Sequence, residues 1–281
     1  MNNKTKLTGS MAVAVLAAIL QTAQAQTTPI TGWGTETGNQ NGSPVSTDDG
    51  LGNFSLTGAT LTGNDAPRAL FSTLSLVNVG DNITLSGSFT FTGGFGGMQN
   101  DQFRFGLYNK LAANTGTLSG GTWSSATDTG WLGYTVEVGA SGGSTQLFQR
   151  NTGNSGQWFS GTGQTSMNAS STSATAAAGT YVFTLSLTLA SPTSYNIVDS
   201  FNQTVGGSYA SGNSVTVSDN NFSFNAVGFL LNNNVAGGVT PYTFNNVDVT
   251  FTPAPAPEPA TLSMIGLGFG AMVVTMRRRN V

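Results

Sequence analysis

The chain has 281 residues, of which 7% are charged, and it contains no histidine and no cysteine. These absences exclude disulfides, thiolate nucleophiles, histidine bases and histidine or cysteine metal sites. Between the termini there are eleven acidic residues and four basic ones, Arg68, Arg104, Lys110 and Arg150, which gives a net charge of 4 − 11 = −7. The four basic residues are scattered along the sequence. Nucleic-acid binding needs clustered cations, so this sequence does not favour it.

Residues 1–25 predict an export signal. Lys4 and Lys6 form a charged N-terminal region, an apolar run from Met11 to Leu20 follows, and Ala23-Gln24-Ala25 has the small-residue spacing of a cleavage site. An uncleaved anchor is the alternative, but about ten apolar residues are too few to span about 30 Å of hydrocarbon. We therefore expect an N-terminal signal helix and a mature chain that begins at Gln26.

The segment 26–47 is rich in Gly, Thr, Asn and Pro, and it predicts an irregular lead-in. Residues 48–252 then place apolar residues at every second position in short stretches separated by turn residues, which is typical of strands. No stretch keeps a helical period for a dozen residues, and 166–179 predicts a loop. Roughly ten antiparallel strands in one β-sandwich domain are therefore expected. The stretches are 82–91, 102–109, 131–138, 180–190, 222–232 and 242–251, with weaker ones at 53–61, 70–77, 145–150 and 194–201.

The stretch 222–232 changes its apolar phase. Phe222 and Phe224 are followed by Val227, Phe229 and Leu231, one position out of step. Because a shift of one residue exchanges the two faces of a strand, the sequence predicts a β-bulge near residues 225–227, or burial on both sides there.

This layout resembles the concanavalin A-like jelly roll of the laminin G and legume lectin type, over about residues 50–252. The resemblance rests on the strand pattern, the stretch "NDQFRFGLYN" and the late pair "FLLNNN" and "YTFNNVDVTF". It implies that the last strand returns beside the first, with "NNVDVTF" pairing near "NFSLTG". An immunoglobulin-like sandwich and a single-stranded β-helix are the alternatives.

The resemblance also raises the possibility of an enzyme, because this fold hosts glycoside hydrolases and polysaccharide lyases. Its laminarinase-type hydrolases carry two carboxylates in a Glu-x-Asp-x-x-Glu strand, which this chain lacks, and retaining hydrolysis needs such a pair about 5 Å apart. Its lyases use a set that includes histidine. We expect no catalytic residue, and we expect Glu137 to be a solvated residue of a strand. The alternative is a lyase or hydrolase that uses Arg104, Tyr108 and Glu137.

A glycan contact is the next question. Arg104 is out of phase with Phe103, Phe105 and Leu107, so it projects from the other face of its strand. With Tyr108, and with Trp123 or Trp131, it is a candidate saccharide platform, since aromatic faces stack on sugar rings. Trp158, in a loop, is a further candidate contact. The ordinary interpretation of Arg104 is a surface arginine beside core aromatics.

Oxygen-rich turns are the only candidates for metal binding. They are Asp48-Asp49-Gly50, Asn64-Asp65, Asn100-Asp101 and residues 218–221. Ca²⁺ prefers oxygen ligands, but Asp and Asn dominate turns for backbone reasons, and none of these turns follows a calcium-loop pattern. We expect no metal site, with bound Ca²⁺ as the only possible cofactor.

Residues 253–281 form a separate C-terminal segment. A proline-rich spacer is followed by an apolar stretch, 260–276, at the lower limit for a transmembrane helix, and then by Arg277, Arg278 and Arg279. Pro257-Glu258-Pro259, the apolar stretch and the arginines together resemble the PEP-CTERM sorting signal of Gram-negative bacteria. The resemblance implies transient anchoring in the inner membrane, processing by exosortase, and delivery to the cell surface and its extracellular polysaccharide.

Taken together, these features predict an exported protein of the cell surface or extracellular matrix. Its low-charge surface, rich in Thr, Asn and Ser, suits hydrogen bonding to neutral or weakly charged glycans. A structural, adhesive or glycan-binding β-sandwich is therefore expected.

Overall fold

The computed structural model describes residues 24–37, 45–56, 64–91, 103–112, 117–119, 122–124, 130–140, 144–150, 164–169, 178–232 and 242–255. Regular structure in these ranges consists of strands, and none of them holds a helix with the length and hydropathy to cross a membrane. Ala25–Thr252 form one compact unit. The expected signal helix and C-terminal transmembrane helix lie outside the described residues and stay predictions.

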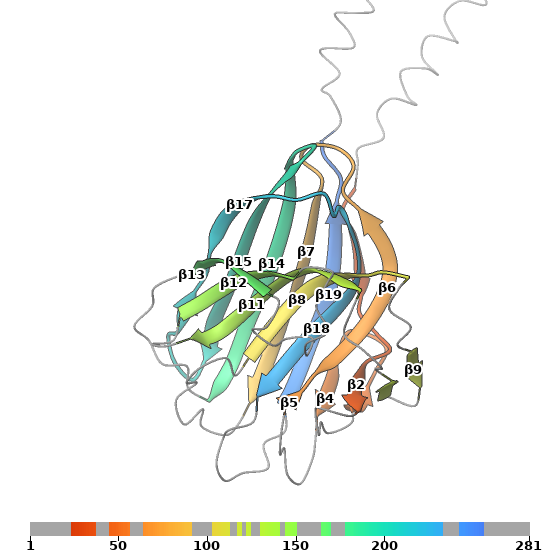
Figure 1. Ribbon diagram of the computed structural model, residues 1–281. Coiled ribbons are helices and arrows are strands. Elements are labelled where there is room, and N and C mark those ends of the chain that lie inside the picture. Colours follow the sequence, from red (N-terminus) through yellow and green to blue (C-terminus); the bar gives the residue numbers. More distant parts are fainter. Residues whose placement is uncertain are drawn as a thin grey trace, which may run out of the picture. The chain divides into compact units, whose positions relative to one another are not determined.

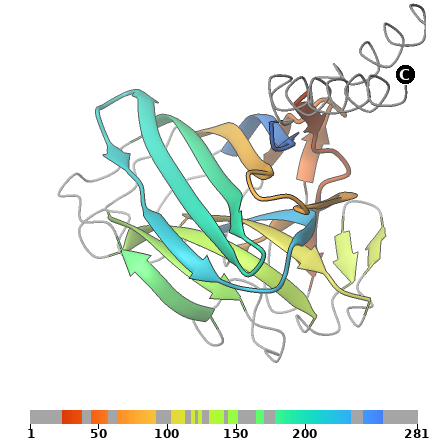
Figure 2. The same cartoon turned by 90° about the horizontal axis from the view of Figure 1, so that it is seen from above.

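Two sheets make up this unit, and they lie face to face as two layers (Figures 1 and 2). Sheet A has nine strands, in the order β16 (Ala210–Ser211), β15 (Ser194–Val205), β14 (Gly179–Ser191), β7 (Asn82–Phe91), β19 (Tyr242–Thr252), β4 (Phe54–Leu56) and β3 (Val45–Asp48), with β1 (Gln26–Pro29) beside β19 and β17 (Ser214–Ser218) beside β15.

Sheet B has ten strands and forms the other layer. Their order is β13 (Gln164–Ala169), β12 (Ser144–Arg150), β11 (Trp131–Ala140), β8 (Phe103–Lys110), β18 (Ser223–Asn232), β6 (Pro67–Ser75), β2 (Gly34–Thr37), β10 (Thr122–Ser124) and β9 (Thr117–Ser119), with β5 (Asn64–Asp65) beside β18. The strand pairs are antiparallel except for β10 with β2. The expected antiparallel β-sandwich is thus confirmed.

The two alternative folds are wrong. A β-helix is built from parallel coils, whereas these strands pair almost entirely antiparallel. An immunoglobulin-like sandwich has about seven to nine strands in total. Sheet A alone has nine strands, and sheet B has ten.

The core lies between the sheets and is built from the alternation that the sequence shows. In β14, Tyr181, Phe183, Leu185 and Leu187 are fully buried, while the residues between them are not. Facing aromatic rings fill the space between layers: Phe89 of sheet A stacks on Phe103 of sheet B with ring centroids 4.7 Å apart. Each such buried ring contributes about 1.5–3 kcal/mol of burial free energy, so the core specifies which face of each strand points inward.

The phase change in β18 has the predicted cause. The register with β6 shifts between Phe224 and Ala226, which is a β-bulge. Every residue from Ala226 to Leu231 is buried, so burial on both sides accompanies the bulge. This central strand of sheet B therefore packs on both of its faces.

The irregular lead-in expected for residues 26–47 is wrong, because this segment contributes β1, β2 and most of β3. These short segments lack apolar alternation, and tertiary pairing rather than propensity makes them strands. β1 pairs with Asp248 to Phe251 of β19, and only Tyr242 to Phe244 of β19 pair with β4. The last strand thus meets the first strands as expected, but through different residues. The loop expected at 166–179 also begins inside β13.

Candidate functional site

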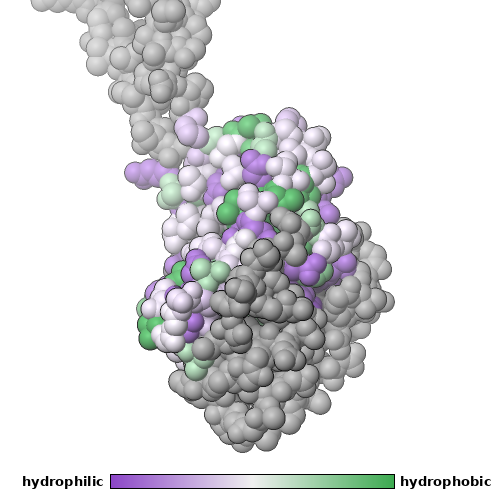
Figure 3. Space-filling model, turned by 90° about the vertical axis from the view of Figure 1, so that its left-hand side faces the viewer, coloured by the Kyte–Doolittle hydropathy of each residue, from purple (hydrophilic) through white to green (hydrophobic). Residues whose placement is uncertain are grey.

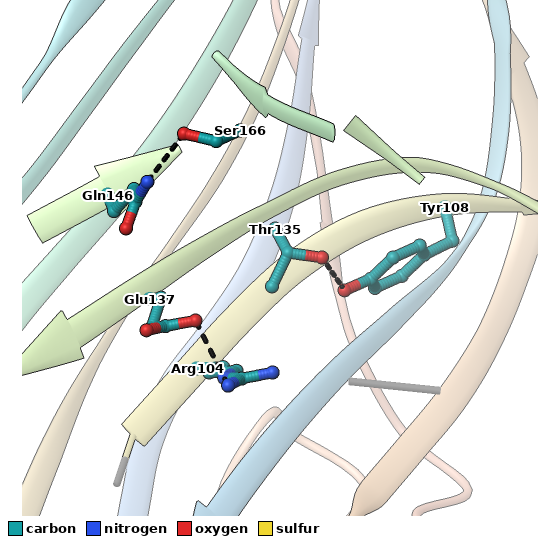
Figure 4. A network of polar contacts seen from close by, with 6 residues as sticks. All are labelled: Arg104, Tyr108, Thr135, Glu137, Gln146 and Ser166. Carbon is teal, nitrogen blue, oxygen red and sulfur yellow. Dashed lines mark hydrogen bonds and ion pairs between the residues drawn. The ribbon is translucent and has the colours of Figure 1, made fainter. Parts of the chain in front are cut away.

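The outward face of sheet B carries the polar residues that the sequence singles out on β8 and β11. Registers place Arg104 directly opposite Glu137 and Tyr108 opposite Gly133. The inward positions between them, such as Phe105, belong to the core. Arg104, Tyr108 and Glu137 therefore share one face of two neighbouring strands, as Figure 4 shows.

Arg104 and Glu137 form a buried ion pair. A guanidinium nitrogen of Arg104 lies 3.0 Å from Glu137 Oε2, and the two residues are 4% and 3% exposed. The expected solvated glutamate and the ordinary interpretation of a surface arginine are therefore both wrong. A carboxylate in this position is held by its partner, because an unpaired buried charge is strongly unfavourable.

Tyr108 is fully buried and is fixed by a hydrogen bond. Its hydroxyl lies 2.6 Å from Thr135 Oγ1. The ring lies over Gly106, where a Cβ atom would collide with the phenol oxygen. Burial raises the pKa of Tyr108, and this outweighs the opposing effects of Thr135 and of the nearby guanidinium charges. The phenol therefore stays protonated at neutral pH.

Three of the four basic residues of the body gather on this face. Arg68 and Arg150, which are each 1% exposed, lie on the same face as Arg104. All three are close enough to Tyr108 to act electrostatically on its pKa. The Arg68 guanidinium also lies 5.7 Å from the centre of the Trp131 ring, a cation–π geometry. The scatter of these arginines along the sequence is therefore not a scatter in space. Their burial keeps them off the molecular surface.

Gly133 makes this crowded face possible. Its φ is +150°, and a Cβ there would meet the Leu107 carbonyl oxygen as well as Tyr108 Cα at 2.8 Å. We expect Gly133→Ala to destabilise the fold by about 3 kcal/mol, from backbone strain and overpacking together. Gly32→Ala is the matched control, because Gly32 also has positive φ (+72°) but open space around it. Its cost should be about 1 kcal/mol. Equal shifts of the two variants in urea unfolding would contradict the packing argument.

The chemistry available around Glu137 is limited. The outward neighbours of Glu137 on the flanking strands are Arg104 on β8 and Gln146 on β12. Gln146 donates to Ser166 on β13, so the row ends in a neutral hydrogen bond (Figure 4). A retaining glycosidase needs a second carboxylate about 5 Å away. The residues that flank Glu137 in this row supply a cation and an amide instead.

The predicted glycan contacts are either buried or outside the described residues. Trp131 is buried with Tyr108, Ala66, Ala226 and Leu230 in a small apolar cluster. Trp158 lies outside the described residues. Arg104 and Tyr108 lie together as expected, but beneath the surface, so a contact of these residues with glycan stays a prediction.

Where the structure describes the oxygen-rich turns, their aspartate carboxylates accept hydrogen bonds from other groups of the protein. Asp48 Oδ2 accepts from the amides of Gly32 (2.7 Å) and Trp33 (3.0 Å). Asp49 accepts from Leu51 and Asn53, and Asp219 accepts from Tyr134, Gln149 and its own turn. No group of three carboxylates that could hold a metal occurs among the described residues. Asn100-Asp101 and the side chains of Asn64-Asp65 lie outside them, and Ca²⁺ binding stays a prediction.

The terminal signals lie almost entirely beyond the described ranges. Ala23, Pro257-Glu258-Pro259 and Arg277 to Arg279 fall outside them. Ala25 is described and exposed, and Gln26 begins β1. Cleavage after Ala25 and sorting through the C-terminal segment stay predictions.

Comparisons with known proteins identify similar folds only. No protein-family model and no curated protein matches the chain. Peanut lectin with a nine-residue peptide is 12% identical, with 84% of this chain and all of that chain covered and a TM-score of 0.45. Basic winged bean lectin with Tn-antigen is 10% identical, with 83% and 100% covered and a TM-score of 0.47. The metal-free carbohydrate recognition domain of Emp46p is 10% identical, with 73% and 83% covered and a TM-score of 0.45.

Proposed function

We propose that this protein is an exported, non-catalytic β-sandwich that binds glycans in the extracellular polysaccharide of the cell surface. One observation carries the proposal: of the eleven acidic and basic side chains that the structure describes, the sandwich buries six, and it presents hydroxyl and amide groups instead. Among the described side chains, six acidic or basic residues are buried in the sandwich. They are Arg68, Asp81, Arg104, Glu137, Arg150 and Asp199.

The described surface therefore has little charge with which to attract a partner. The ionisable side chains that keep some exposure are Asp48, Asp49, Lys110, Asp219 and Asp248. The part of the molecule coloured in Figure 3 is mostly pale, with purple and green confined to small separate patches. Hydroxyl and amide groups both donate and accept hydrogen bonds, which suits a partner rich in hydroxyls. Glycans have that chemistry.

The proposal predicts retention without cleavage. We expect the purified full-length protein to co-sediment with one or more matrix polysaccharides and to release no reducing ends and no unsaturated products. New reducing ends would support the hydrolase alternative, and unsaturated products the lyase alternative built on Arg104, Tyr108 and Glu137. Failure to retain any polysaccharide in a broad panel would contradict the glycan-binding proposal itself.

Delivery to the surface is the second part of the proposal. The order Pro257-Glu258-Pro259, apolar stretch and Arg277 to Arg279, together with the export signal predicted for residues 1–25, supports sorting by exosortase. We expect Glu258→Ala, or deletion of the three arginines, to leave an unprocessed precursor in the inner membrane. Pro253→Ala, which changes the spacer but not the tripeptide, should be processed normally. Mass spectrometry of the mature C-terminus reads this directly; normal surface delivery of the Glu258→Ala protein would contradict the sorting mechanism.

A further inference from the structure

The outward face of sheet A is built almost entirely from small polar side chains. Inward positions of its four long strands belong to the core, so the alternate residues point outward. We call these outward residues the hydroxyl face. They are Asn82, Thr84, Ser86, Ser88 and Thr90 on β7; Thr180, Val182, Thr184, Ser186 and Thr188 on β14; Asn196, Val198, Ser200 and Asn202 on β15; and Thr243, Asn245, Asp248, Thr250 and Thr252 on β19.

Strand registers align these side chains in rows across the sheet. Asp248, Ser86, Thr184 and Ser200 lie side by side on β19, β7, β14 and β15. Similar rows run on either side of it, one starting from Thr250 and Thr84. Because neighbouring strands are about 4.8 Å apart, each row offers polar groups at a regular spacing of about that distance.

Hydrogen bonds between neighbours fix the rows in place. Thr84 and Ser186 hydroxyls are 3.0 Å apart, and Thr184 and Ser200 hydroxyls are 2.8 Å apart. A hydroxyl has one donor and two acceptor positions, so a lateral bond leaves capacity for a ligand. The side chains are thereby oriented before any ligand arrives, which lowers the entropy lost on binding.

The charge of the hydroxyl face selects the class of ligand. Its one ionisable residue is Asp248, whereas a soluble surface is typically about 25–35% charged. The preference of threonine for strands explains the threonines, and the low charge of the face follows the 7% of charged residues in the whole chain. A polyanion would meet one carboxylate and no cation here, so an uncharged ligand fits and an acidic one does not.

The face also selects a long ligand over a short one. It has no aromatic ring for a sugar to stack on, and its apolar members are Val182 and Val198. Binding would depend on many hydrogen bonds, each adding only a small factor in affinity. Such contacts become useful when a polymer makes several of them at once.

We propose that the hydroxyl face is the binding surface for a neutral, extended polysaccharide that lies across several strands. The inference rests on the proposed glycan-binding function and adds the face and the chemical class of the ligand. It also separates the binding surface from the buried arginine layer of sheet B, which lies on the outward side of the other sheet.

The test compares two double variants. The face variant carries Thr84→Val and Thr184→Val, in the middle of the hydroxyl face. The control pair carries Thr73→Val and Thr165→Val. The control pair lies at exposed positions of sheet B, on β6 and β13. Valine keeps the branched shape and strand preference of threonine and removes the hydroxyl. Full-length proteins with matched thermal unfolding are measured for co-sedimentation with amorphous cellulose, curdlan and polygalacturonate.

We expect the wild type and the control pair to bind at least one of the two neutral glucans and not polygalacturonate, and the face variant to bind about tenfold more weakly. Glucan oligosaccharides of about four units should not compete. If the face variant binds a neutral glucan as well as the wild type does, this inference is overturned, and the glycan-binding function still stands. Preference for polygalacturonate, or full competition by the oligosaccharide, also overturns it. A wild type that binds none of the polymers, but self-associates through Thr84 and Thr184, assigns the face to a second copy and overturns the inference.

Discussion

Glu137→Gln is expected to lower the free energy of unfolding by about 3–5 kcal/mol, the usual cost of breaking a buried ion pair by changing one partner. The carboxylate lies 3.0 Å from the Arg104 guanidinium, and both residues are almost fully buried. Glutamine keeps the length of the side chain but not its charge. The cost therefore reports the electrostatic role of the pair and not a cavity.

A double variant separates this cost from the net value of the pair. Replacing both partners, Arg104→Met with Glu137→Leu, should cost less than the single change Glu137→Gln, because apolar residues of similar size need no charge partner. Asp248→Asn, at a partly exposed carboxylate on sheet A, is the control and should change stability by about 0.5 kcal/mol or less. Urea unfolding at pH 7 gives all three values. A double variant that costs as much as Glu137→Gln, or more, would contradict the ion pair as the source of that cost.

The sequence predicted most of the sandwich but not this pair. Alternation in β7, β8, β11 and β14 identified the inward residues correctly, because burial between two sheets imposes a period of two. Arg104 and Glu137 were recognised as outward, and an outward position normally means solvent. What reversed that inference is the second layer of burial on sheet B, where Ala226 to Leu231 are buried without alternation. That continuous apolar run in β18 was the available signal.

Short strands at the edges escaped prediction for a related reason. β1 and β2 carry no apolar alternation, and they are strands because β19 and β6 offer unpaired edges to them. Pairing of this kind depends on residues about 30 to 220 positions away in the chain, as in Gly34 with Arg68 and Gln26 with Phe251, so local pattern cannot reveal it.

The burial of Asp199 could have been predicted from the sequence. In the stretch "SYNIVDSF" it falls in phase with Tyr195, Ile197 and Phe201, all of which are buried. Phase alone therefore places a carboxylate inside the sandwich, where the structure finds it 2% exposed. Asn213 donates to it at 3.4 Å, and the Asp199 amide donates to the Asn213 carbonyl at 3.0 Å.

This buried carboxylate should make stability depend on pH. Burial raises the pKa of Asp199 to about 6 from an ordinary 3.8, against smaller opposing effects of Asn213 and Thr145. The folded state then holds the proton more tightly than the unfolded chain does. The stabilisation is complete below about pH 4 and is lost as the pH rises to about 6. Above that, the ionised group costs about 3 kcal/mol. The neighbouring phenol of Tyr209, whose pKa burial raises to about 12, stays neutral throughout.

Asp199→Asn is therefore expected to stabilise the protein at neutral pH. Asparagine keeps the shape and a carbonyl acceptor for Asn213 but cannot ionise, so the gain at pH 7 should approach about 3 kcal/mol and vanish near pH 4. Urea unfolding of variant and wild type at half-unit steps from pH 4 to pH 8 measures it. Asp49→Asn is the control of opposite sign, because hydrogen bonds from Asn53 and Leu51 lower the pKa of that exposed carboxyl. A stability difference between Asp199→Asn and wild type that does not change over this range would show that Asp199 does not titrate between pH 4 and pH 6 in the folded protein.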